Sequence, residues 1–440
     1  MHDDRVTHAA GPSTPSAQHA DDEQALPGHG TSTAEADAPA HGHSHSGPLH
    51  LSKGEHRRVV LVLVALVVPL VLATLAGLAL LWPSSSELVG SQSFTAPGTR
   101  TESATVTDLD VTACTQAAGA LGAMSDGSLL KSAVCAEITT GDSAGVVMPV
   151  HVPAESLPAA DVGDRLTVLY APDAIAGGTP FVLVDYDRQV PVGALTIVYL
   201  VVVLAVAGRK GALSVIGLLL SSAVLLLFMI PALLEGGSPM PVTLTGSVAM
   251  MLVAVYVAHG ISVRTTTALL GTLAGVVITV LLAMWGVGEA NLTGAVGEEA
   301  MTLTALVPGL ELRSLLTCGM VIAGLGVLND VTITQASAVW ELHAANPSLG
   351  RGRLFTSGMR IGRDHIASTV YTLAFAYAGT ALPLILSASL IDRAVIDTML
   401  SGEIAEELVR TLVSSIGLVL AIPATTLIAA LLCRTERVGD

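Results

Sequence analysis

Acidic and hydroxyl side chains recur at regular spacing within an apolar stretch in the C-terminal half of the chain. Four of them follow one another at steps of four, three and four residues: Asp330, Thr334, Ser337 and Glu341. On a helix this spacing places them on one face. A carboxylate at membrane depth is costly unless it faces protein or water, so it marks a functional site by default. We expect Asp330 either to bind a cation or a proton in transport, or to fix the helix register by pairing with loop arginines.

A second polar set follows after an arginine-rich loop. Asp364, Ser368 and Tyr371 would share one line of a helix, and His365, Thr369 and Thr372 the next. We expect the two helices to face each other and to bind a solute or ion through these residues: Asn329, Asp330, Thr334, Ser337, Asp364, His365, Thr369 and Thr372. Structural ion pairs at the membrane interface are expected for Glu341, Arg360 and Arg363.

The composition predicts that these helices belong to an all-α polytopic membrane domain. About half of the 440 residues are hydrophobic, the mean hydropathy is +0.68, and 13% are charged, whereas soluble proteins carry about 25% charged residues. Apolar segments of about 20 residues can cross a bilayer as helices. About eight such transmembrane helices are predicted, at Val59–Trp82, Pro191–Ala207, Ala212–Leu234, Val242–Ala258, Thr265–Trp285, Leu315–Ala338, Ile366–Leu386 and Val409–Cys433.

The charges between these segments predict the orientation. Arginine and lysine concentrate in alternate short loops, for example at Arg209, Lys210 and Arg264, and short basic loops stay in the cytoplasm. Both termini are therefore expected to be cytoplasmic, with the protein in the plasma membrane. The formal net charge of −16 gives no support for nucleic-acid binding.

The sequence predicts four parts: a disordered cytoplasmic tail (1–56), a first transmembrane helix (57–83), an extracytoplasmic β-rich domain (84–190) and a seven-helix membrane domain (191–440). Short runs rich in Val, Thr and Tyr, bounded by Gly, Pro and Asp, predict a small barrel of the OB or SH3-like kind. Cys114 and Cys135 lie in this domain, and an oxidising exterior would allow a disulfide that spacing alone neither fixes nor excludes.

Three further motifs each allow two interpretations. The tail histidines, His41, His43, His45 and His50, fit either a zinc or nickel site or a solvated tail, and the second is favoured because no ordered scaffold fixes a geometry. Met301–Leu310 is too short to cross a bilayer and is either re-entrant or interfacial. The GDSAG string around Ser143 favours a hairpin turn over a nucleophile elbow, because a strand pattern follows it. No enzyme activity, cofactor or resident metal is expected.

Three sequence pieces resemble the YibE/F-like family of bacterial multi-pass membrane proteins: HGISVRTTTALLGTLAG, GVLNDVTITQASAVWEL and LFTSGMRIGRDHIASTVYTLAFAYAGTALPL. The resemblance covers roughly residues 182–432, and the third piece is its most specific part. The sequence departs from the family pattern at His365, where the family has isoleucine after GRD. The resemblance implies an integral plasma-membrane protein without an assigned reaction.

Two functions are compatible with this sequence. The first is a permease or channel-like carrier for a small solute or ion, with Asp330 at its polar centre. The alternative is a non-transporting membrane scaffold or sensor whose exterior domain binds a partner. The expected partners are the lipid bilayer and either a small solute or a second copy of the chain in a homo-oligomer.

Overall fold

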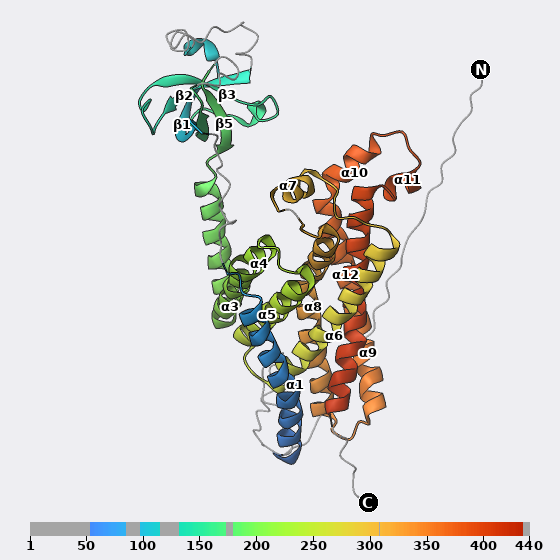
Figure 1. Cartoon of the computed structure of the whole chain (residues 1–440). Coiled ribbons are helices and arrows are strands. Elements are labelled where there is room, and N and C mark those ends of the chain that lie inside the picture. Colours follow the sequence, from blue (N-terminus) through green and yellow to red (C-terminus); the bar gives the residue numbers. More distant parts are fainter. Residues whose placement is uncertain (1–52, 85–96, 115–131, 173–178, 308, 434–440) are drawn as a thin grey trace, which may run out of the picture. The chain divides into compact units, whose positions relative to one another are not determined.

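The computed structural model describes residues 53–84, 97–114, 132–172, 179–307 and 309–433. Residues 1–52 of the predicted tail, with its histidines, lie outside these residues, whereas residues 53–56 begin helix α1. The helices are α1 (Lys53–Leu80), α3 (Gln189–Val224), a π-helical turn (Leu225–Met229), α4 (Ile230–Leu234), α5 (Pro239–His259), α6 (Val263–Glu289), α7 (Glu298–Leu306), α8 (Leu312–Ala345), α9 (Arg351–Thr380), α10 (Leu382–Ser389), α11 (Val395–Met399) and α12 (Gly402–Leu432) (Figure 1).

The β-rich domain is a closed five-stranded barrel. Its strands are β1 (Arg100–Asp108), β2 (Ala133–Ile138), β3 (Val147–His151), β4 (Arg165–Tyr170) and β5 (Phe181–Tyr186), in the order β1-β2-β3-β5-β4. β3 and β5 pair in parallel, and the other pairs are antiparallel. Alternate residues of each strand face inward, as period-two patterning requires, and form a core that includes Val106, Val134, Ile138, Val168 and Phe181.

Six helices are long and apolar enough to cross a membrane among the residues that the structure describes, and the bent pair α9–α10 makes a seventh if it counts as one span. The sequence predicted about eight. The difference lies at Gln189–Leu234, where two predicted segments form one continuous run. A span needs only about 20 residues, so a run of 46 residues exceeds what one crossing requires.

This long run is broken at Gly208. Its φ of 54° and ψ of −131° are not helical, and a positive φ is a conformation that glycine adopts readily. A Cβ atom built on Gly211 would lie 2.6 Å from the carbonyl oxygen of Val203. In a continuous helix, residues eight apart are separated by about 12 Å along the axis. The chain therefore bends sharply at Gly208, beside Arg209 and Lys210.

Helices α6, α8 and α12 pack against one another, although they are far apart in the sequence. Glycines permit the close approach. A Cβ atom on Gly275 would lie 2.8 Å from Leu328 of α8, and one on Gly271 would collide with Thr425 of α12. The Gly271–Gly275 pair therefore serves helix packing inside one chain, as small residues do in membranes.

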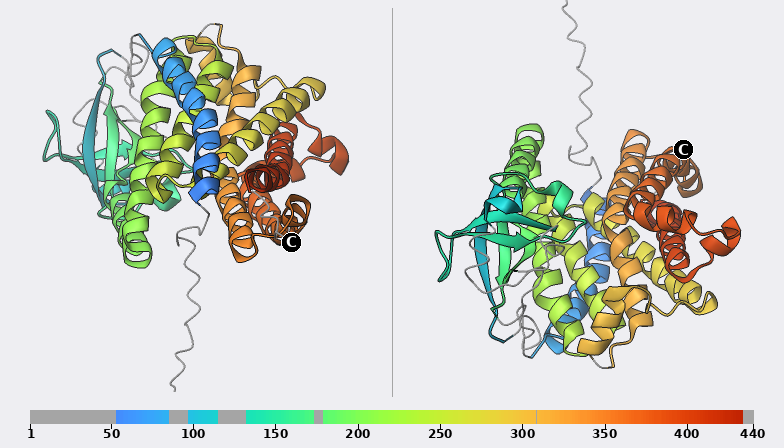
Figure 2. Two further views of the ribbon diagram at one scale, coloured as in Figure 1. Left: turned by 90° about the horizontal axis from the view of Figure 1, so that it is seen from below. Right: turned by 90° about the horizontal axis from the view of Figure 1, so that it is seen from above.

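Helix α9 packs on α8 and α12 (Figure 2). Gly358 and Gly362 are buried, and a Cβ atom on Gly362 would lie 2.5 Å from Ile422 of α12 and 3.1 Å from Gln335 Oε1 of α8. Beyond these glycines most side chains of α9 are exposed. The first half of α9 is therefore fixed to the bundle, while most side chains of its second half are exposed.

Candidate solute-binding site between α8 and α9

A pocket of about 380 Å³ lies between α8 and α9. It is lined from α8 by Gly326, Val327, Asp330, Val331 and Thr334, and from α9 by His365, Ser368, Thr369 and Thr372. Five of the eight residues predicted to bind a solute thus meet at one pocket. Asn329, Ser337 and Asp364 lie outside it.

The pocket sits halfway along both helices. Asp330 is 18 residues from the first residue of α8 and 15 from the last, by subtraction from Leu312 and Ala345. At 1.5 Å per residue it is about 22 Å from the nearer end. His365 is similarly central in α9, 14 residues from its start and 15 from its end. Asp330 therefore lies within the predicted span Leu315–Ala338, whereas His365 directly precedes the predicted span Ile366–Leu386.

Three hydroxyl groups of the pocket already use their hydrogen atoms. Thr334 donates to the carbonyl oxygen of Asp330 at 3.0 Å, and Thr372 to that of Ser368 at 3.0 Å. Thr369 donates to the carbonyl oxygen of His365 at 2.7 Å. A hydroxyl has one hydrogen and two lone pairs, so these threonines have acceptors left to offer a ligand. Together with the carboxylate of Asp330 they make the pocket rich in acceptors.

The charge of the pocket is acidic. Neither arginine nor lysine is among the described residues that line it, and Asp330 is exposed. His365 is the basic side chain among the described lining residues, so the carboxylate of Asp330 shares the pocket with an imidazole but with no arginine or lysine. A bound cation, or a solute that donates hydrogen bonds, would complement this surface.

The side chain of Asn329 is less exposed than that of its neighbour Asp330. It is half-buried, and its Oδ1 atom is buried without a hydrogen-bond partner among the described residues. Its backbone carbonyl oxygen accepts a bond from Thr332 at 3.0 Å. The amide therefore lies outside the pocket that it was predicted to line.

The predicted interface ion pairs have a different arrangement. Glu341 pairs with Arg264 at the start of α6, with 3.6 Å between Oε1 and Nη1. Arg360 and Arg363 are exposed, and within the described part of the chain neither forms an ion pair. The sequence had predicted interface ion pairs for all three residues without naming Arg264. A residue about 80 positions away could not be selected from spacing along one helix.

The sequence pattern did not predict a buried hydrogen-bond network between α8 and its neighbouring helices. Gln335 donates to the carbonyl oxygen of Gly358 at 2.9 Å and to Thr426 Oγ1 at 2.7 Å. Trp340 donates to Thr267 at 3.1 Å, and Thr272 and Thr332 bond at 2.6 Å. These bonds connect α8 with α6, α9 and α12. The available signal was a glutamine in an apolar segment, off the stripe of Asp330.

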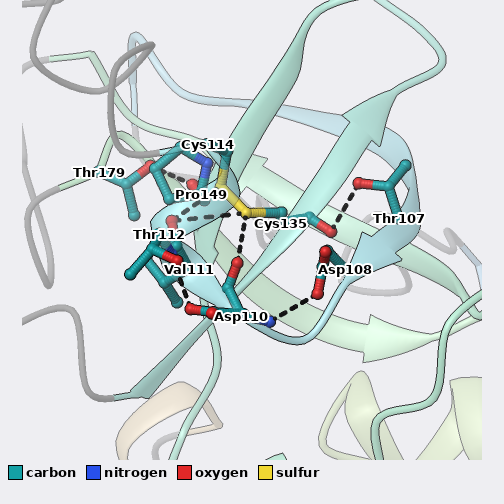
Figure 3. The surroundings of a disulfide bond; sticks show 9 residues. All are labelled: Thr107, Asp108, Asp110, Val111, Thr112, Cys114, Cys135, Pro149 and Thr179. Carbon is teal, nitrogen blue, oxygen red and sulfur yellow. Dashed lines mark hydrogen bonds between the residues drawn. A yellow bond between two sulfur atoms is a disulfide. The ribbon is translucent and has the colours of Figure 1, made fainter.

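The barrel contains a disulfide between Cys114 and Cys135, with 5.8 Å between the Cα atoms (Figure 3). Beside it, Asp110 accepts a bond from the backbone N–H of Thr112 at 3.0 Å. This bond holds the pKa of Asp110 below its usual value. The short 3-10 helix Val111–Ala113 is capped in this way and leads into Cys114.

The GDSAG segment forms a turn between β2 and β3. Gly141 and Gly145 both have a φ of 83°, a region that favours glycine. A strand follows the turn, whereas a nucleophile elbow places its serine between a strand and a helix. Ser143 therefore does not have the setting of a hydrolase nucleophile.

Comparison with models of protein families finds a match. The model of the YibE/F-like protein family matches residues 195–435, which is more than half of the chain. No curated protein and no solved structure matches. The matched region contains both helices of the pocket. The chain therefore belongs to the YibE/F-like protein family.

Proposed function

We propose that this membrane protein is a permease or channel-like carrier for a small cation, with the α8–α9 pocket as its polar centre. One observation supports the proposal most strongly: Asp330, His365 and three threonine hydroxyls with free acceptor sites line the same pocket, midway along α8 and α9. Such ionisable groups inside membranes mark ion and proton paths. The role is a non-enzymatic one.

The size and chemistry of the pocket support a small cationic solute. Its volume of about 380 Å³ lies near the lower end of ligand pockets, which run from about 300 to 1,000 Å³. One carboxylate and several neutral oxygens suit a monovalent metal ion or an alkylammonium. Transport also needs binding weak enough for release.

We further propose an eight-span topology with cytoplasmic termini. The six helices, the α9–α10 pair and a division of Gln189–Leu234 at Gly208 together give eight crossings. Arg209 and Lys210 at this break fit a cytoplasmic turn. This topology places the barrel outside the plasma membrane, where a disulfide is stable.

The strand order of the barrel supports an OB-type assignment. OB folds are five-stranded Greek-key barrels, and the parallel pairing of β3 with β5 breaks the simple meander. Within the proposed topology the barrel is an extracytoplasmic domain, joined to the membrane part by α3.

Flux in proteoliposomes tests the proposed function. Wild type and Asp330→Asn would be reconstituted at equal density and assayed with rubidium, methylammonium and protons. A matched control is Asp364→Asn, which also removes an exposed carboxylate of the same region but lies outside the pocket. The expected result is flux in wild type and Asp364→Asn, and its loss in Asp330→Asn. Flux no higher than in empty vesicles for all three cations would overturn the proposal.

A further inference from the structure

The pocket belongs to a continuous face of α8 that no helix of the described chain covers. Its residues recur at steps of four, three, four and four: Gly319, Ala323, Gly326, Asp330 and Thr334. The last four are exposed, and a Cβ atom on Gly319 or Gly326 would meet nothing within 4 Å. On α9 this face continues with the exposed residues His365, Ser368 and Thr372. We call these eight residues the open face.

The open face is unsuited to contact with lipid. Asp330 lies within the predicted span Leu315–Ala338, and its side chain is exposed. Hydrocarbon offers no hydrogen bond to a carboxylate, so ionisable groups at this depth face protein or water. In a single copy the pocket also lacks an outer wall, since α8 and α9 are the elements of the described chain that line it. Something other than lipid must cover it.

The small residues of the open face suit another helix as the cover. Gly319, Ala323 and Gly326 follow one another by one helical turn, and small side chains let helix backbones approach closely in membranes. Elsewhere in this chain such glycines face a neighbouring helix. Gly275 against Leu328 is one example and Gly362 against Ile422 another. Gly319 and Gly326 could admit a helix in the same way, but a Cβ atom on either would meet no other helix of the described chain.

The charges of the open face point to a second copy of the chain. The face carries one carboxylate, Asp330, and one imidazole, His365. In a twofold contact the same patch occurs on both subunits, so residue i of one meets residue j of the other. Such a contact lets Asp330 of each copy meet His365 of its partner, so that the carboxylate gains a hydrogen-bond donor.

We propose that two copies pack through their open faces around a twofold axis, so that each copy supplies the missing wall of the other's pocket. The transport path then runs along the dimer interface rather than through one chain. Only the statement that transport runs along this interface rests on the proposed function. The contact itself is a separate claim and is tested without any flux measurement.

Cysteine cross-linking in intact membranes tests the contact. The buried Cys318 and Cys433 would first be replaced by alanine, and Cys114 and Cys135 are already bridged. Single cysteines would then be placed at Ala323 and Ser368 of the open face. The matched controls are Leu281→Cys on α6 and Leu219→Cys on α3, at large side chains that are 62% and 64% exposed. All four positions are exposed, so each variant is expected to fold.

The expected result is an oxidant-dependent dimer for Ala323→Cys and Ser368→Cys, with the controls at background. Counting photobleaching steps of the fluorescently tagged full chain in vesicles should give two steps. One step, cross-links through the control positions alone, or cross-links of Ala323→Cys to a different protein would overturn the proposal. Flux from a monomer would leave the proposed function intact while removing this interface, so the two failures are distinguishable.

Discussion

Helix α8 has two polar faces that differ in how their side chains are satisfied. On the inner face, Gln335 and Trp340 are buried and donate hydrogen bonds to other helices. On the outer face, Asp330 is exposed and Thr334 bonds only to its own helix. Polar groups that hold a membrane bundle together are partnered inside it, whereas groups that handle a ligand keep free acceptors. The position of a polar residue within a span therefore matters less than whether it has a partner.

The largest stability effect should come from a substitution that separates α9 from α8 and α12. Gly362→Val would place its Cβ atom 2.5 Å from Ile422 and 3.1 Å from Gln335 Oε1. Overpacking of this kind costs about 1–3 kcal/mol. We expect a lower free energy of unfolding in mixed detergent micelles and a widened α8–α9 pocket. Gly352→Ala, where a Cβ atom meets nothing within 4 Å, is the control and should be neutral. Equal stability of the two variants would contradict the packing described for α9.

A smaller loss is expected from the inner face itself. Gln335→Leu keeps the side-chain volume but removes two donated hydrogen bonds. A lost hydrogen bond of this kind costs about 1 kcal/mol, and interhelical bonds in membranes average somewhat less. The unfolding free energy should therefore fall by about 1–2 kcal/mol.

The matched substitution on the outer face is Thr334→Val, which removes a hydroxyl bonded only within α8. Its effect on stability should stay within about 0.5 kcal/mol, as for surface positions generally, while the flux of cations falls. If Thr334→Val destabilised the protein more than Gln335→Leu, the distinction between the faces would be lost.

Much of this organisation could be predicted from the sequence. The spacing of Asp330 and Thr334 placed them on one helix face, and the second set supplied His365 and Thr372 to the same pocket. Periodicity is a local property, so it identifies a face reliably. It does not tell which face points inward, and so it missed Gln335.

The features that the sequence did not predict depend on contacts between residues distant in the sequence. The partner of Glu341 is Arg264 of another helix, and the contacts of Gln335 reach Thr426. Neither pair has a local signature. The count of about eight spans stays a prediction for a similar reason, because helical conformation continues on both sides of Gly208 and only its backbone angles break the run. The strand pattern predicted a barrel, but pattern alone gives no strand order.

The barrel, unlike the inner face of α8, contains a buried carboxylate that lacks a partner for one oxygen among the described residues. Glu102 of β1 is only 4% exposed, and its Oε2 atom has no hydrogen-bond partner among the described residues. Burial raises the pKa of Glu102 above its usual value, against a smaller opposing effect of Arg100 and with a contribution from Asp142. Because the folded pKa is the higher one, the group favours the folded state below its unfolded pKa. This contribution is lost as the pH rises through the folded value.

Glu102→Gln removes the charge that burial disfavours. The variant should therefore slow hydrogen exchange of the barrel strands in the full chain at neutral pH. The advantage over wild type should shrink at acidic pH, where Glu102 is itself protonated. An advantage that grew on acidification would show that the carboxylate is stabilised in its charged form, against the burial argument.

The most direct test of the account measures which charge the α8–α9 pocket accepts. A cysteine at Thr334, in a chain with Cys318 and Cys433 replaced by alanine, would be modified by cationic and by anionic methanethiosulfonates. Each rate is divided by that of the same reagent with a free thiol. The account predicts faster modification by the cationic reagent, because Asp330 attracts it, and loss of this preference when Asp330→Asn is added. Equal normalised rates, or a preference that survives Asp330→Asn, would contradict a cation-accepting pocket built around Asp330.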